Sequence, residues 1–185
     1  MAEYYLISQL PSLDGIGENA PLPITEEYFA ELCARFLGKK AQQAMKNSTL
    51  SPAKKPERSG SALIDAWNES ERTLRFALAK MRAEKMGKPF DTEGRRFPAE
   101  YIRAASAAME IENPMEAEKY LNRCRLDLLE TLRPADPFSE DYLFYYGLKL
   151  KLLLRIRQFD AKSGEAAYKN IYGSILNGDR LEARQ

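Results

Sequence analysis

Residues 139–159 have the sequence SEDYLFYYGLKLKLLLRIRQF, the longest mainly apolar stretch of the chain. A helix over this stretch has no polar face of ordinary width, so other elements must surround it. Ser139 is a favourable N-cap, Glu140 and Asp141 suit the first turn, and the basic residues lie in the C-terminal half, as the helix macrodipole favours. We therefore predict that this stretch is a central helix on which the rest of the chain packs.

Four cations interrupt this stretch and argue against a transmembrane helix, because each would cost about 2.5–3.5 kcal/mol in the middle of a span. They are Lys149, Lys151, Arg155 and Arg157. We expect their long side chains to run along apolar neighbours and end in water. Gly147 costs about 1 kcal/mol relative to alanine in a helix interior. Its presence predicts a close helix crossing, with a functional hinge as the alternative.

Composition indicates one helical domain over residues 1–185 without evident catalytic machinery. The chain has 44% hydrophobic residues, a net charge of +1 and no histidine. Without histidine there is no Ser-His or Cys-His pair, no His-ligated zinc site and no Glu-x-x-His di-iron motif. The sequence also lacks a glycine-rich phosphate loop, a CxxC pair and a nucleophile elbow. We expect no catalytic residue, no cofactor and no metal, and an enzyme of undetected type is the least favoured alternative.

The cysteines and the N-terminus bear on the cellular compartment. Cys33 and Cys124 each fall on the apolar stripe of a predicted helix, where a thiol behaves as a small buried hydrophobe. We predict free core thiols, and one disulfide between them remains the alternative. The opening MAEYYLISQLPSLDG lacks the basic start and long apolar core of a signal peptide, so a cytoplasmic protein is expected.

The remaining sequence predicts an all-α bundle of six or seven helices around the central one. The helical patterns lie at 25–38, 39–46, 62–86, 98–109, 113–132 and 167–176. We expect the helices around Phe29, Leu74, Leu121 and Ile171 to pack on the central helix. Residues 3–10 (EYYLISQL) are too few to distinguish a strand from a helical turn, but their tyrosines and aliphatic residues should be buried. Residues 47–61 are rich in Ser, Pro, Lys and Gly, which is typical of a mobile surface loop with almost nothing to bury.

The charges are unevenly distributed. Residues 1–34 contain no lysine or arginine, whereas residues 72–88 are dominated by them. The predicted helix over 62–86 places an apolar stripe on one side and leaves a basic face on the other. Candidate partner-binding residues on this face are Arg72, Arg75, Arg82 and Lys85.

Other roles of the charged residues, apart from binding a protein partner, are ion pairing within a helix, solvation and contact with a nucleic acid. Glu71 lies four residues before Arg75, which predicts a helical ion pair. Carboxylates such as Glu69, Glu71, Glu110 and Glu112 are interpreted as solvated. The basic face could instead contact a nucleic-acid backbone, although no aromatic residues alternate with the cations there and the net charge is near zero.

Five short motifs are spread along the chain: Tyr4-Tyr5-Leu6-Ile7, Leu74-Arg75, residues 82–87 (RAEKMG), residues 112–116 (ENPME) and Tyr146-x-x-Lys149-Leu150. With these motifs the chain resembles a bacterial family of unknown function that is encoded beside V-type ATPase subunits. More distantly, the chain is similar to the C (or d) subunit of A/V-type rotary ATPases, the helical adaptor between the central shaft and the proteolipid ring, but it is much shorter than a full C subunit.

This resemblance implies a non-enzymatic protein that acts by protein–protein contact. Its partners would be cytoplasmic or central-stalk subunits of a V-type ATPase, and it would be peripheral at the cytoplasmic face of the membrane. A reduced form of the adaptor and an accessory factor both fit these motifs.

Overall fold

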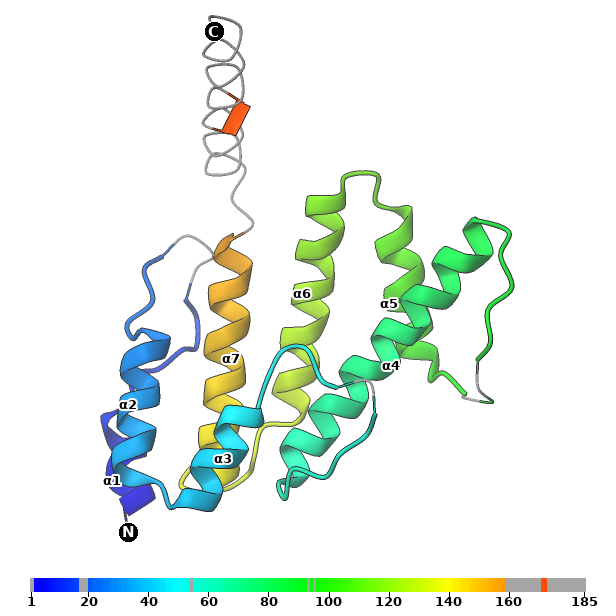
Figure 1. Cartoon of the computed structure of the whole chain (residues 1–185). Coiled ribbons are helices and arrows are strands. Elements are labelled where there is room, and N and C mark those ends of the chain that lie inside the picture. The colour runs from blue at the N-terminus through cyan, green and yellow to red at the C-terminus, as the bar shows by residue number, and fades with distance from the viewer. Residues whose placement is uncertain are drawn as a thin grey trace, which may run out of the picture.

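Seven helices, and no strand, are present in the residues that the computed structural model describes: 2–16, 20–53, 55–92, 94, 96–158 and 171–172. They are α1 (Ala2–Gln9), α2 (Glu26–Phe36), α3 (Lys39–Asn47), α4 (Ala62–Lys85), α5 (Ala99–Glu110), α6 (Pro114–Thr131) and α7 (Glu140–Gln158) (Figure 1). Thr25, Ser61 and Asn113 cap α2, α4 and α6 by accepting hydrogen bonds from backbone N–H groups. The all-α prediction is confirmed, and residues 2–9 are helical.

The predicted central helix is α7. It contacts α2, α3, α4 and α6, and Leu148, Leu150 and Leu152 are fully buried. Ser139 Oγ accepts a hydrogen bond from the Tyr142 N–H at 3.2 Å, as expected of an N-cap. Burial on more than one side is therefore confirmed, while Phe159, the predicted last residue, lies outside the described part of the chain.

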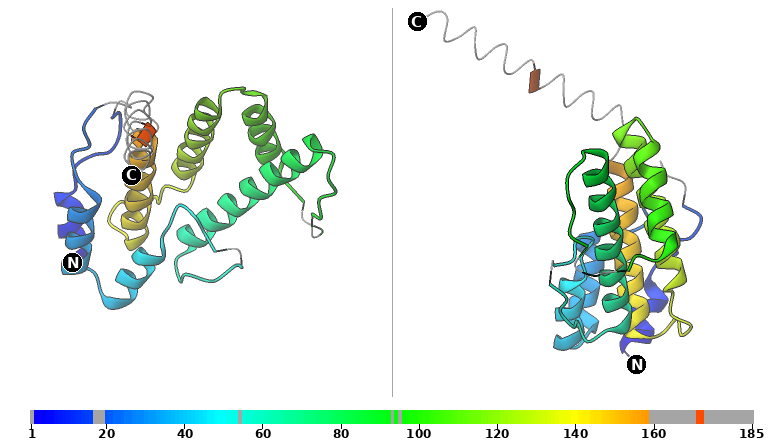
Figure 2. Two further views of the ribbon diagram at one scale, coloured as in Figure 1. Left: turned by 45° about the horizontal axis from the view of Figure 1, so that its top comes forward. Right: turned by 90° about the vertical axis from the view of Figure 1, so that its right-hand side faces the viewer.

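Helices α7, α6 and α5 lie side by side, and α4 runs obliquely across them (Figures 1 and 2). The first half of α4 places Ile64 and Trp67 in the main hydrophobic cluster with α7. Its second half packs Leu74 on α5, in a second cluster that includes Leu121 of α6. The helices around Leu74 and Leu121, α4 and α6, do pack on α7, as predicted. The Leu74 and Leu121 side chains themselves lie in the second cluster, because α4 is about 36 Å long and extends beyond α7.

Gly147 marks a close helix crossing, as predicted. A Cβ atom at this position would lie 3.0 Å from Cε1 of Phe29 in α2 and 3.1 Å from Sδ of Met45 in α3. No side chain fits there without a shift of these neighbours. Glycine at position 147 therefore lets three helices meet in the core.

The N-terminal helix buries less than its sequence suggests. Leu6 is fully buried, but Tyr4 and Tyr5 remain more than half exposed, so their expected burial is wrong. Tyr4 stacks on Phe138 with the ring centroids 4.5 Å apart, and Tyr5 lies against Phe36. An eight-residue helix has room for only one inward stripe, and the two tyrosines lie beside it.

The loop between α3 and α4 is tied to the helices through its backbone. The carbonyl of Ser48 accepts a hydrogen bond from Lys151, and that of Thr49 accepts one from Trp67 Nε1 at 3.1 Å. Ser48 and Ser61 are buried. The expectation that residues 47–61 bury almost nothing is therefore wrong, and their mobility stays a prediction.

The two cysteines are free, and the last predicted helix is described at two residues only. Cys33 and Cys124 are free thiols, the first buried and the second half-buried. The predicted helix over 167–176 lies outside the described residues except for Ile171 and Tyr172. These two are helical and more than half exposed.

Candidate functional site: the end of α4 and the ion networks of the core

The four predicted partner-binding residues lie on α4 but do not form one surface. Arg72 is only 9% exposed, which corrects the expectation that it faces solvent. Its guanidinium is bonded to Glu69 Oε2 at 3.2 Å and to the carbonyl of Ala53 at 3.4 Å. Arg72 therefore anchors the α3–α4 loop and is not available to a partner.

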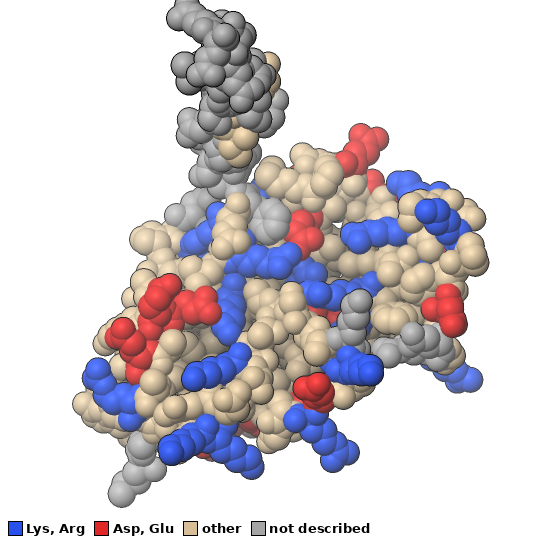
Figure 3. Space-filling view, in the orientation of Figure 1, with Lys and Arg blue, Asp and Glu red and all other residues tan. Residues whose placement is uncertain are grey.

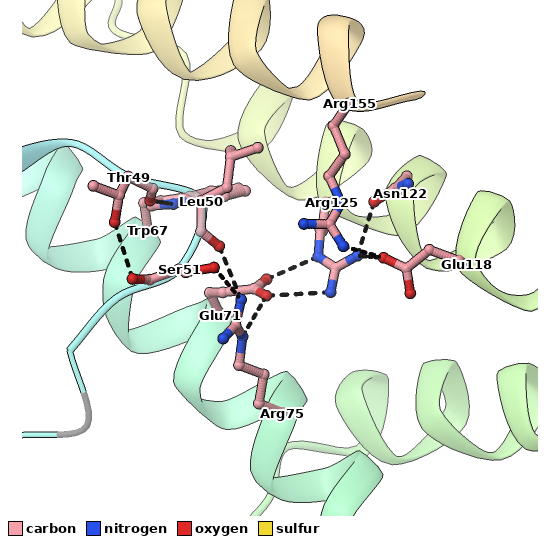
Figure 4. Close-up of polar contacts among 10 residues, drawn as sticks. All are labelled: Thr49, Leu50, Ser51, Trp67, Glu71, Arg75, Glu118, Asn122, Arg125 and Arg155. Atoms are coloured by element: carbon pink, nitrogen blue, oxygen red, sulfur yellow. Dashed lines mark hydrogen bonds and ion pairs between the residues drawn. The ribbon is translucent and has the colours of Figure 1, made fainter. Parts of the chain in front are cut away.

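Arg75 also holds this loop. Its Nε lies 2.9 Å from Glu71 Oε1, which confirms the predicted helical ion pair. Its Nη2 donates to the carbonyl of Leu50 and to Ser51 Oγ, each at 3.0 Å (Figure 4). The guanidinium thus joins α4 to the loop, although part of the side chain is exposed.

Glu71 is the centre of a buried ion network between α4 and α6, shown in Figure 4. Only 1% of Glu71 is exposed, so the interpretation of this carboxylate as solvated is wrong. Arg125 Nε lies 3.0 Å from Glu71 Oε2, and Arg125 Nη2 lies 3.2 Å from Glu71 Oε1. This two-point pairing gives each buried charge the partner that it needs away from water.

Further polar groups complete the network. Arg125 Nη1 donates to Glu118 at 3.0 Å and to Asn122 Oδ1 at 2.8 Å, and Arg155 of α7 reaches Glu118 at 2.7 Å. Burial disfavours the charged form of Arg125, but the nearby carboxylates, Glu71 first, outweigh burial and raise its pKa. The network therefore links α4, α6 and α7 through ion pairs.

Sequence reasoning missed this network, although a signal for it exists. Glu71 lies four residues after Trp67 and three before Leu74, on the apolar stripe of α4. Arg125 lies four residues after Leu121, on the inward face of α6. An acid on one apolar stripe and a base on another would have predicted a buried pair. The apolar residues of α6 recur instead at Ala117, Leu121, Cys124, Leu128 and Leu132, which indicates another inward face. The buried residues are Leu121, Asn122, Arg125 and Leu129.

A second ion network surrounds Lys149. Its Nζ lies 2.5 Å from Asp14 Oδ1, 2.6 Å from Glu130 Oε1 and 3.2 Å from Tyr145 Oη. Only 8% of Lys149 is exposed, so the expectation that it reaches water is wrong. The hydrogen bond from Lys149 is the main cause that lowers the pKa of Asp14. At Glu130, hydrogen bonds from Lys149 and Tyr145 outweigh burial and also lower the pKa.

Acid should lower the stability that the Lys149 network gives to the fold, because Asp14 and Glu130 become protonated. Both folded-state pKa values lie below the usual 3.8 of Asp and 4.5 of Glu, so the unfolded chain binds more protons as the pH falls through this window. We expect the contribution of these two carboxylates to the free energy of unfolding to be fully present above the usual pKa values of 3.8 and 4.5, and to be lost as the pH falls from these values through the lower folded-state pKa values. Urea unfolding of Lys149→Met should show a shallower acid decline than the wild type. Lys39→Met, at an exposed lysine of α3, is the control, and an equally steep decline in Lys149→Met would contradict the assignment.

The exposed cations lie at the C-terminal end of α4. We call Lys80, Arg82, Lys85 and Lys88 the cationic tip. Lys80 lies 3.7 Å from Glu84, whereas Arg82, Lys85 and Lys88 are exposed and form no ion pair with any residue that the structure describes. Figure 3 shows Lys and Arg over the last turns of α4 and Asp and Glu over α2, at the other end of this face. Two of the four predicted residues, Arg82 and Lys85, therefore remain available to a partner.

Comparison with known proteins adds no relative. No family model, curated protein or solved structure matches the chain. Within the described ranges, no group of three or more Cys, Asp or Glu residues is arranged to hold a metal ion. In the same residues, no helix has the length and apolarity needed to cross a bilayer.

Proposed function

We propose that this chain is a non-enzymatic helical subunit or accessory protein of a bacterial V-type ATPase. It acts through protein–protein contacts at the cytoplasmic face of the membrane. Its cationic tip binds an acidic surface on a cytoplasmic or central-stalk subunit. The motifs quoted above, from Tyr4-Tyr5-Leu6-Ile7 to Tyr146-x-x-Lys149-Leu150, support the choice of partner.

The observation that carries the proposal is the division of the α4 cations into two groups. Arg72 and Arg75 have their guanidinium groups bonded to glutamates of α4 and to the α3–α4 loop. Arg82, Lys85 and Lys88 are exposed and have no ion-pair partner among the described residues. Exposed like charges at the end of a helix steer an oppositely charged partner and raise its association rate. The acids over α2 lie away from them, which favours one orientation of approach.

Charge reversal tests the tip. The triple variant Arg82→Glu, Lys85→Glu, Lys88→Glu should fold normally. Its association rate with the ATPase should be at least about tenfold lower than that of the wild type. The difference should shrink as salt rises, because exposed charges are screened over about 8 Å at physiological ionic strength. The measurement is co-purification of a tagged copy from its native host, followed by association kinetics with the recovered subunit.

A matched control carries the same change of net charge elsewhere. Arg35→Glu, Lys39→Glu, Lys40→Glu alters exposed cations of α2 and α3 and should leave the association rate nearly unchanged. Equal slowing by both variants would remove the tip from the mechanism. Recovery of RNA or ribosomes in place of ATPase subunits would contradict the proposed partner and favour nucleic-acid binding.

A further inference from the structure

A pocket of about 310 Å³ lies between α2, α3 and α7, at the other end of the molecule from the cationic tip. Its walls are mainly apolar, with Phe29, Cys33 and Met45 beside the Gly147 crossing. Cys33 is 3% exposed, and burial raises the pKa of its thiol to about 12. The volume lies at the lower end of the range of about 300–1,000 Å³ for small-molecule sites.

The pocket has a defined shape because α2 and α3 are bonded to each other. Gln42 Nε2, in α3, donates to the carbonyls of Ala34 at 2.9 Å and Leu37 at 2.8 Å. These two carbonyls lie at the end of α2, so the side chain holds the two helices at a fixed distance. Ala30 and Ala34 contribute small side chains to the rim and leave the pocket open.

Lys151 supplies a partly buried positive charge to this apolar space. Its side chain is 22% exposed, and its Nζ donates to the carbonyl of Ser48 at 2.5 Å. Glu26 Oε1 is 3.9 Å away and forms an ion pair with Lys151, but it lies beyond hydrogen-bond distance. An ammonium group has three donors, and within the described residues Lys151 uses one. Burial lowers the pKa of Lys151, the change that a nearby anion would oppose.

The charges around the pocket indicate the charge of its ligand. Lys151 and the exposed Lys46 line it together with one carboxylate, Glu26, so the lining carries an excess of one positive charge. A monoanion would balance this charge. A phosphate dianion would leave excess negative charge in a mainly apolar pocket, where charge without a partner is costly. A cation would face Lys151 directly.

We propose that this pocket binds a small monocarboxylate with an apolar chain. The carboxylate accepts hydrogen bonds from Lys151 Nζ, and the chain lies against Phe29, Cys33 and Met45. This inference does not depend on the identity of the protein partner, because it concerns a different surface from the cationic tip.

Octanoate is a suitable probe, with octylamine and octanol as matched compounds that lack the carboxylate. Titration calorimetry should show binding of one octanoate per chain, and the methyl resonance of Met45 should shift in NMR spectra. Octylamine should not bind, and octanol should bind at least about tenfold more weakly, because a charge-assisted hydrogen bond is lost. N-acetylleucine, a model of a peptide C-terminus, should bind more weakly than octanoate because its amide must leave water.

Two variants separate charge from shape. Lys151→Met should weaken octanoate binding about tenfold or more. Ala34→Leu keeps the charge of Lys151 but places a larger side chain at the rim of the pocket. It should abolish octanoate binding. Lys39→Met is the control with unchanged affinity, and circular dichroism verifies that each variant is folded. Equal affinity for octanoate and octylamine, or full affinity in both folded variants, would overturn the proposal. Tighter binding of N-acetylleucine than of octanoate would indicate a peptide C-terminus as the occupant and would overturn the assignment to a small carboxylate with an unsubstituted apolar chain.

Discussion

Replacing Glu71 by alanine is expected to lower the free energy of unfolding by about 3–5 kcal/mol, because the change leaves buried positive charge without its main partner. Arg125 is 7% exposed and would keep only Glu118 and Asn122 as partners. Arg75 would lose its Glu71 bond as well, and with it part of the attachment of the α3–α4 loop. The expected loss is therefore larger than for any exposed ion pair of α4.

Urea denaturation measures this loss, and Glu84→Ala provides the control on the same helix. Glu84 is exposed and pairs with Lys80 at 3.7 Å, so its removal should change the free energy of unfolding by less than about 0.5 kcal/mol. The double variant Glu71→Met, Arg125→Met should recover most of the loss, because buried ion pairs can be replaced by apolar residues of similar size. Similar losses in Glu71→Ala and Glu84→Ala would show that burial does not set the energy of this network.

Gly147→Leu is expected to destabilise the protein by about 1–3 kcal/mol or more, the usual cost of overpacking a core. Even a methyl group at this position would lie 3.0 Å from Phe29 and 3.1 Å from Met45. A leucine side chain would push α7 away from α2 and α3. The higher helix propensity of leucine, worth up to about 1 kcal/mol relative to glycine, does not offset this effect.

A double-mutant cycle tests whether the contact with Met45 causes the loss of stability in Gly147→Leu. Gly147→Leu combined with Met45→Ala should be more stable than the sum of the two single changes predicts, because the smaller residue at position 45 makes room. Additive effects in urea denaturation would indicate that the close approach of α3 does not limit the side chain at 147. The Lys149→Met titration is a separate measurement, since that network joins α7 to α6 and to the loop at Asp14.

Local patterns were sufficient to predict the described helices except α1, because residues 3–10 were too few to distinguish a strand from a helical turn. Apolar periodicity predicted α2, α3, α4 and α6, and Thr25 and Asn113 cap α2 and α6 with side chains that bond to backbone groups two or three residues further on. The all-round apolarity of 139–159 identified the central helix, and the glycine at 147 predicted the close crossing there. These features depend on neighbours a few residues apart, so the sequence contains the information directly.

The candidate site could be predicted only in part. From the sequence alone, four residues are equally good candidates for partner binding, because all are basic and lie on the predicted exposed side of one helix: Arg72, Arg75, Arg82 and Lys85. The structure separates them, since the first two form hydrogen bonds to the α3–α4 loop and the last two are exposed without such a bond to any described residue. The period of a helix does not indicate which of its residues a loop will contact.

The sequence by itself determined that this protein is built of helices around residues 139–159, because hydrogen bonding and apolar spacing within each helix are local. Only the tertiary structure decided which charges are internal. Glu71 and Arg125 are 54 positions apart, and Lys149 meets Asp14 across 135 positions. The crossing of α4 over α6 and α7 brings the first pair together, and the packing of the N-terminal loop on α7 brings the second. A charge enters the core only where such packing supplies its partner, because burying it alone costs more than the fold can compensate.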